Sequence, residues 1–313
     1  MVLSTQMRLI RISGPTLALA AAAALGGCSS DEPAGGNGTR VVATTPLVAD
    51  IARRVAGDPG TVRAMLSPNS DPHEYEPRPS DARSVAEAAV VLRSGGELDE
   101  WLTDLVEAAG GDAHVVNLME AAETIEGDDG ADPHWWHDPR NGAAATRAVR
   151  DALTRANPDG RDRYARNAAR YERELRSVDA AVADCMRAVP RERRKLVTTH
   201  DALGYFARRF GIEVIGSVIP SLSTEAQPSA GDTAELIDQI ESEGVEVVFA
   251  ESSVDSKVEE AIAREAGARI GDQLWADGLG PDGSSGDTYL GSLEANADAM
   301  VRGFTGGEGG CRR

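Results

Sequence analysis

The sequence predicts an α/β protein with two lobes, each a mostly parallel sheet flanked by helices, joined by one long helix. Over 41–118, short apolar segments typical of strands alternate with segments whose apolar residues have helical spacing. The same alternation resumes after Pro190. Between them, the run over 159–186 is rich in Ala, Arg and Glu and has no Gly or Pro after Gly160. Strands that alternate with helices form right-handed βαβ units and therefore a parallel sheet.

The N-terminal lobe is expected to cover residues 41–157. Its first strand ends at Pro46, and the helix that follows has apolar residues at a helical spacing before Gly57. We expect Ser80 to cap a later helix of this lobe. The expected strands are 41–45, 61–66, 90–93 and 115–118, and the expected helices are 47–56, 81–88, 98–109 and 142–155.

The linking helix, residues 158–188, has Pro158 at its start and is longer than most helices of globular proteins. It is either a simple surface helix or a spine between the lobes. The C-terminal lobe is expected over 189–313, and Gly211 marks the end of its first helix. The expected strands are 196–199, 212–218, 245–250 and 268–274, and the expected helices are 201–210, 233–243, 256–266 and 290–304.

The first residues have the order of an export signal. Arg8 and Arg11 precede an uncharged apolar run over 16–25 that is too short to span a bilayer. We expect residues 1–27 to be a signal peptide and residues 28–40 to be a flexible tether. The ending Leu25-Gly26-Gly27-Cys28 resembles a lipobox, which would leave Cys28 lipidated on the extracytoplasmic face of the cell membrane. The alternative is an ordinary cleavage site with an incidental cysteine.

Charge and cysteine content narrow the possible functions. The formal net charge of −19 at pH 7 argues against nucleic-acid binding, which needs a basic surface. Two cysteines, Cys185 and Cys311, remain after the predicted signal, and an exported protein permits a disulfide. We predict that they pair, which would tie the C-terminal segment to the middle of the chain. The alternative is two independent thiols.

Three histidines and one aspartate occupy comparable positions in the predicted fold. His73 follows a strand, His134 lies late in the first lobe, and His200 comes directly after the first strand of the second lobe. Asp277 lies in a later loop that also follows a strand. Ligands of open α/β sheets bind beyond the carboxyl ends of the strands, so these side chains could meet in a cleft between the lobes. The alternatives to Asp277 are Asp272, Asp282 and Asp287.

The segment 132–141 is the most unusual in the chain. It contains His134, His137 and two tryptophans between two Asp-Pro pairs, and proline stiffens such a loop. Tryptophan beside a neutral imidazole can exclude water from a metal ligand. The alternative is an aromatic plug with incidental histidines.

These motifs together resemble the metal-binding solute-binding lipoproteins of bacterial ABC transporters, the zinc and manganese family. The resemblance covers nearly the whole predicted mature chain in family order. The matching pieces are Thr44-Thr45-Pro46, Asp71-Pro72-His73-Glu74-Tyr75-Glu76-Pro77, Asp132-Pro133-His134 with Trp136, Thr198 to Tyr205, Ala250-Glu251 and Gly286-Asp287-Thr288-Tyr289.

The resemblance implies two lobes joined by a rigid helix, with the metal between them on His73, His134, His200 and Asp277. Three imidazoles and one carboxylate suit Zn²⁺, whereas Mn²⁺ prefers more oxygen ligands. We therefore expect Zn²⁺ as the transported ligand, with Mn²⁺ or iron less favoured. Affinity should fall below about pH 6, because only neutral imidazoles bind metal.

Three further residues are possible auxiliaries of the site. No ligand role carries over to His137, which could be a neighbour of the ligands, an uptake ligand or a surface residue. Glu74 and Glu251 are the other two, and either could be imagined as the general base of a hydrolase.

The resemblance implies a monomeric, lipid-anchored protein that delivers zinc to an ABC permease and its ATPase, and no enzymatic activity. One alternative is an envelope zinc hydrolase, but four protein ligands would leave no position for a reacting water. The other is an adhesin or a passive zinc store that needs no permease.

Overall fold

The computed structural model describes residues 39–58, 61–127 and 130–311. The predicted signal peptide over 1–27, the predicted lipidation site Cys28 and the tether up to residue 38 lie outside these residues. Among the residues that are described, no helix is long and apolar enough to cross a membrane.

The N-terminal half contains a four-stranded parallel sheet in the order β2-β1-β3-β4. Val41 of β1 pairs with Val62 of β2 on one side and with Val90 of β3 on the other. The strands are β1 (Val41–Ala43), β2 (Val62–Ala64), β3 (Val90–Arg93) and β4 (His114–Asn117), and the helices are α1 (Pro46–Ala56), α2 (Pro79–Ala86) and α3 (Leu102–Ala109).

Local chemistry explains where these helices begin and end. The Thr45 side chain caps α1 by accepting from Val48 N, and Gly57 ends it with a left-handed φ of 76°. The prediction that Ser80 caps α2 is wrong, because Pro79 takes the first helical position and Asp81 accepts from Arg78 N. The helix predicted over 98–109 begins as a 3-10 helix, η2 (Gly96–Asp99), and only then continues as α3.

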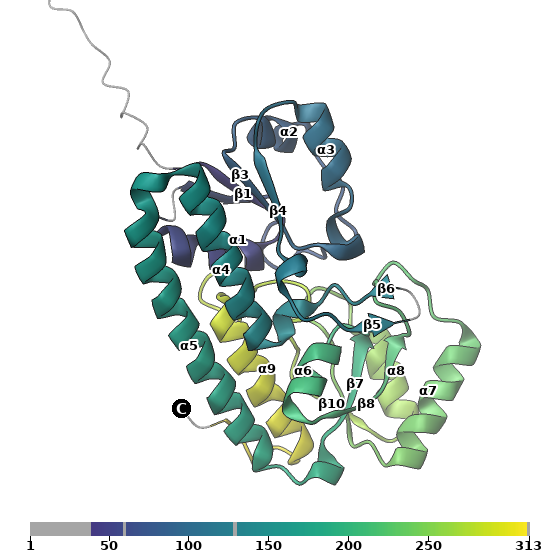
Figure 1. Ribbon diagram of the computed structural model, residues 1–313. Coiled ribbons are helices and arrows are strands. Elements are labelled where there is room, and N and C mark those ends of the chain that lie inside the picture. Colours follow the sequence, from purple (N-terminus) through teal and green to yellow (C-terminus); the bar gives the residue numbers. More distant parts are fainter. Residues whose placement is uncertain (1–38, 59–60, 128–129, 312–313) are drawn as a thin grey trace, which may run out of the picture. The chain divides into compact units, whose positions relative to one another are not determined.

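Two long helices follow this sheet. Asp138 caps α4 (Pro139–Ala156), which therefore starts earlier than the predicted residue 142. The long predicted helix is α5 (Arg161–Arg187), preceded by the 3-10 turn η5 (Pro158–Gly160). α4 packs along α5, and α5 also contacts α1 and α9 (Tyr289–Phe304), as Figure 1 shows.

The C-terminal half also contains parallel strand pairs, one of longer strands and one of strands of only two residues. β7 (Lys195–His200) pairs with β8 (Glu213–Ile219), and β9 (Val247–Val248) pairs with β10 (Arg269–Ile270). Phe249 N donates to Val197 O at 2.9 Å, so β9 runs beside β7. The strands predicted over 245–250 and 268–274 are correct in place but much too long. The helices here are α6 (Gly204–Phe210), α7 (Ala230–Glu243) and α8 (Lys257–Glu265), and α9 follows them.

A small antiparallel hairpin was not predicted from the sequence. It pairs β5 (Glu126–Gly127) with β6 (Gly130–Ala131) directly before the segment that carries His134. Two-residue strands rich in Gly and acidic residues have no apolar alternation that a sequence pattern could detect.

The largest hydrophobic cluster runs through both halves of the fold. It includes Val41 of β1, Tyr171 of α5, Phe206 of α6 and Phe304 of α9, all almost completely buried. The α/β class with a parallel sheet flanked by helices is confirmed. The boundaries of the two lobes stay a prediction, because residues from both halves belong to the same hydrophobic cluster.

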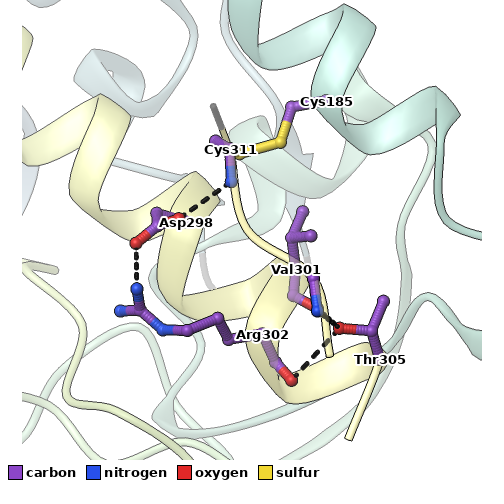
Figure 2. The surroundings of a disulfide bond; sticks show 7 residues. Cys185, Asp298, Val301, Arg302, Thr305 and Cys311 are labelled. Carbon is purple, nitrogen blue, oxygen red and sulfur yellow. Dashed lines mark hydrogen bonds and ion pairs between the residues drawn. A yellow bond between two sulfur atoms is a disulfide. The ribbon is translucent and has the colours of Figure 1, made fainter. Parts of the chain in front are cut away.

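A disulfide closes the fold near its C-terminal end (Figure 2). It joins Cys185 on α5 to Cys311, which lies beyond the end of α9. Cys311 N also donates to the Asp298 side chain of α9 at 2.8 Å (Figure 2). The covalent link that the sequence predicts is therefore present, and it attaches the segment after α9 to the long helix.

Candidate metal centre

Four side chains from four separate segments converge in the structure. His73 lies between β2 and α2, His134 precedes the 3-10 helix η4 (Trp135–His137), His200 ends β7, and Asp277 lies between β10 and α9. One ligand atom from each lies within 4.8 Å of the others. His73 lies in the loop after β2, and His200 is the last residue of β7, so both lie beyond or at the carboxyl end of a parallel strand, where such folds place their ligands.

The converging atoms are the Nε2 nitrogens of the three rings and the oxygens of one carboxylate. His73 Nε2 and both oxygens of Asp277 are buried and have no hydrogen-bond partner of good geometry. The distances are 3.3 Å from His134 Nε2 to Asp277 Oδ1, 3.3 Å from His200 Nε2 to Asp277 Oδ2, 3.7 Å from His73 Nε2 to Asp277 Oδ2, and 3.4 Å between the Nε2 atoms of His134 and His200.

Three of these separations, 3.3, 3.3 and 3.4 Å, are close to those between the ligands of a tetrahedral cation. Ligands about 2.0–2.1 Å from a tetrahedral zinc ion lie about 3.3 Å from one another, which follows from the geometry of the tetrahedron. The side chains of His134, His200 and Asp277 are completely buried, whereas that of His73 is 6% exposed. The donor set can therefore enclose one metal ion and exclude water from it.

The rings of His134 and His200 are each held by a carboxylate on their other nitrogen. Asp132 Oδ1 lies 2.7 Å from His134 Nδ1, and the two oxygens of Glu251 lie 2.9 and 2.8 Å from His200 Nδ1. A carboxylate there favours the tautomer with hydrogen on Nδ1, which leaves Nε2 free for metal. Glu251 also accepts from His200 N at 3.0 Å, so it fixes both the ring and the backbone.

The two tryptophans anchor the His134 segment. Trp135 Nε1 donates to Ser94 O at 3.1 Å, and Trp136 Nε1 donates to Ala276 O at 2.9 Å. The Trp136 ring also packs against the His134 ring at a centroid distance of 5.4 Å. Trp136 therefore joins the segment that supplies His134 to the segment that supplies Asp277.

The histidines differ in their affinity for protons. Burial lowers the pKa of His73 to about 4, even though Asp277 is nearby. Burial alone would also lower the pKa of His134, but its hydrogen bond to Asp132 and the adjacent Asp277 carboxylate raise it to about 10. Asp132 and Asp277 therefore outweigh desolvation at His134, whereas Asp277 and Asp71 do not outweigh it at His73.

Burial and neighbouring charges also shift the pKa values of His200 and Asp277 in opposite directions. Burial alone would lower the pKa of His200, but the charges of Asp277 and Glu251 raise it. Burial would raise the pKa of Asp277, but the neighbouring imidazoles of His200 and His134 hold it below its ordinary value. Without metal, protons on the histidines thus neutralise the buried carboxylate.

The possible auxiliary residues lie outside the cluster of four. His137 is buried with both ring nitrogens unpartnered, and burial lowers its pKa to about 3. Glu251 contacts the ring of His200, and Glu74 is exposed. The alternatives to Asp277 lie elsewhere, since Asp272 pairs with Arg302, Asp287 accepts from Gly283 N, and Asp282 is exposed.

Sequence reasoning missed the roles of Asp71 and Asp132. Each stands two residues before a histidine in Asp-Pro-His, and each accepts from that histidine's backbone N at 2.9 Å. The side chain of an aspartate often accepts a hydrogen bond from the backbone N of the residue two positions later. The repeated Asp-Pro-His motif could therefore have predicted these two hydrogen bonds.

Comparison with known proteins decides the family. The profile of the ZnuA family, described as zinc-uptake complex component A periplasmic, matches residues 41–303. The chain belongs to this family. The recognition made from the motifs is confirmed, and the chain is a metal-binding substrate-binding protein of the ABC transporter type.

The relatives carry the names of different metals. The manganese-binding lipoprotein MntA of Halalkalibacterium halodurans is 29% identical, with 89% of this chain and 94% of MntA covered. The iron-binding protein YfeA of Yersinia pestis is 28% identical over 85% of this chain and 86% of YfeA. The periplasmic zinc-binding protein TroA of Treponema pallidum has a TM-score of 0.80 and 28% identity, with 85% of this chain and 99% of TroA covered.

Proposed function

We propose that this protein captures Zn²⁺ between His73, His134, His200 and Asp277 and delivers it to an ABC permease with its ATPase. The observation that carries the proposal is the convergence of one ligand atom from each of the three histidines and Asp277 within 4.8 Å of one another. A lipid on Cys28 would hold the protein, as a monomer, at the outer face of the cell membrane, and the name of MntA includes the word lipoprotein.

The choice of zinc rests on the donor set. Three imidazoles and one carboxylate make a four-coordinate site of the kind that zinc prefers, while manganese favours more oxygen ligands. The names of the relatives point to manganese and iron as well as zinc. The chemistry of the four side chains therefore supports the preference for zinc, and the names support metal capture in general.

The hydrolase alternative lacks the parts that it needs. A catalytic zinc keeps one coordination position open and has a general base beside it. Here four protein ligands fill the positions, Glu251 is engaged by His200, and Glu74 is exposed. MntA and YfeA are named as metal-binding proteins. An adhesive or storage role would need the same metal but no permease. Loss of zinc uptake by the host when this protein is removed would therefore favour the transport role over these two.

Titration calorimetry on the metal-stripped protein tests the proposal. We expect one zinc per chain, and a weaker response to Mn²⁺ under the same conditions. The double variant His134→Ala, His200→Ala should lose this binding. Tighter binding of Mn²⁺ than of Zn²⁺ would overturn the metal assignment, and unchanged zinc affinity in the double variant would overturn the site. Elemental analysis of the protein purified from its host would identify the metal carried in the cell.

A further inference from the structure

The two Asp-Pro-His turns use their aspartates differently. In both, one carboxylate oxygen accepts from the histidine's backbone N at 2.9 Å. Asp132 Oδ1 also holds the ring of its own histidine at 2.7 Å. Asp71 instead directs its second oxygen to Thr224, whose hydroxyl donates to Asp71 Oδ2 at 2.7 Å across 153 residues of sequence.

His73 also has the weakest local support of the three histidines. His200 belongs to a strand, and His134 precedes a 3-10 helix whose tryptophans are anchored by hydrogen bonds. His73 lies between β2 and α2, in a stretch of loop without a strand or an α-helix. Its position therefore depends on contacts that this loop makes with other parts of the chain.

Those contacts reach the C-terminal half at two places. Asn69 donates from its backbone N to Leu279 O at 2.8 Å and from its side chain to Ser252 O at 3.0 Å. The hydrogen bond from Thr224 to Asp71 is the second place. Only this second connection continues directly to His73, because the same carboxylate accepts from His73 N.

A small cavity adjoins His73 on this side of the site. Its volume is about 90 Å³, and its lining comes from the N-terminal half and from the loop that carries Thr224. His73 is also the ligand whose side chain is not completely buried. Displacement of the His73 loop would therefore open the metal centre toward this cavity. The cavity is lined by His73, Glu97, Pro133, Leu222, Ser223 and Glu225, among others.

We infer that Thr224 is a positioning residue that controls metal release: its hydrogen bond to Asp71 holds the His73 loop closed over the ion. This inference rests on the proposed function. A hydrogen bond to a carboxylate is stronger than one between neutral groups, and this one is largely shielded from water because Thr224 is buried. Breaking it frees the His73 loop while the other three ligands keep their own supports.

The test is the rate of zinc release from the full chain, measured by stopped flow with an excess of chelator. Thr224→Val should release zinc about tenfold faster than the wild type, which is the size expected for the loss of one charge-assisted hydrogen bond. Thr224→Ser keeps the hydroxyl and should release zinc at nearly the wild-type rate. Thr233→Val is the matched control, because its hydroxyl bonds only to Ser229 O in its own helix turn.

Two measurements separate this inference from its alternatives. The zinc content of each variant is determined first, and the visible spectrum of the cobalt-loaded protein reports whether the ligand set is intact. Thr224→Val with one zinc, an unchanged cobalt spectrum and a wild-type release rate would overturn the role of Thr224 and leave the proposed function standing. A wild-type chain that takes up no metal would overturn both.

A second variant guards against misfolding of Thr224→Val. Asp71→Asn keeps an oxygen for His73 N and removes the charge to which Thr224 donates. It should also release zinc faster, while the metal-free protein should unfold near the wild-type temperature. A release rate equal to that of the wild type would contradict the inference independently.

Discussion

The Nε2 atoms of His134 and His200 face each other at 3.4 Å, in rings inclined by 69°. The Nδ1 atom of each ring is already engaged by a carboxylate, so two neutral rings would point lone pairs at one another. A proton or a metal cation between the rings and Asp277 relieves this repulsion. The metal centre is therefore arranged for positive charge before any ion arrives.

Zinc binding should release protons. At pH 7 a pKa of about 10 keeps His134 protonated in the metal-free protein, and the charges of Asp277 and Glu251 raise the pKa of His200, whereas His73, with a pKa of about 4, is already neutral. Metal binding requires neutral imidazoles, so we expect protons to leave when zinc binds. Apparent affinity should then rise with pH through neutrality and fall as pH drops, starting well above the pH of about 6 that an ordinary histidine would give.

Calorimetry in buffers of different ionisation enthalpy measures this release. Asp132→Asn should reduce the number of protons released, because Asp132 is a main cause of the raised pKa of His134. Identical binding enthalpies in all buffers would contradict the prediction.

Glu251, whose carboxylate contacts His200 Nδ1, should contribute more to zinc affinity than the exposed Glu74. Glu251→Gln removes the charge that holds His200 Nδ1 and should lower zinc affinity about 10- to 100-fold, as is typical for such supporting groups. Glu74→Gln is the control, because Glu74 is exposed and should leave the affinity unchanged. Competition with a chelator of known affinity measures both variants, and equal losses in the two would argue against this role of Glu251.

Trp136 should contribute to stability and to affinity through one hydrogen bond. Trp136→Phe leaves Ala276 O without its donor in a buried place, which should cost about 1–3 kcal/mol of unfolding free energy. Zinc affinity should fall as well, since Asp277 is the next residue in the chain. Trp275→Phe loses a bond to Ser285 that is longer, at 3.3 Å, and exposed, so its effect should be much smaller. Urea unfolding followed by circular dichroism would compare the two, and an equal loss would contradict the prediction.

The disulfide should stabilise the fold without affecting the metal. The double variant Cys185→Ala, Cys311→Ala removes a link across 126 residues and should lower the free energy of unfolding by about 2–5 kcal/mol. Zinc affinity should stay near that of the wild type, because the link joins α5 to the segment after α9 and not to a loop of the metal centre. A large loss of zinc affinity in the folded double variant would show that the two regions are coupled.

The sequence was most informative where chemistry and position coincide. His73 and His200 could be placed because each follows a strand, and the structure brings both to the cluster with His134 and Asp277. Strand lengths were predicted poorly, because apolar runs such as 245–250 continue beyond the residues that make ladder hydrogen bonds. The long helix, predicted over 158–188, was placed within three residues at its start and one at its end, since no Gly or Pro interrupts it after Gly160.

Contacts between distant segments could not be predicted from a single sequence. The bond from Thr224 to Asp71 and the burial of His137 depend on how loops pack in space, and no periodic pattern records them. Glu251 was predicted only as a possible auxiliary of the site, and its contact with Nδ1 of His200 became clear only from the structure. Residue type thus indicated the four side chains that converge, and tertiary packing showed which residues contact them.

The hydrophobic cluster shared by both halves has a consequence for how the chain folds. Its members extend from β1 to α9, and Tyr289 N of α9 donates to Asp50 of α1 across 239 residues. The core therefore cannot close around α1 until α9 has been synthesised, so a fragment that ends before α9 should remain unfolded and sensitive to protease. A polypeptide that stays open this long is well suited to crossing a membrane through a narrow channel and folding on the far side.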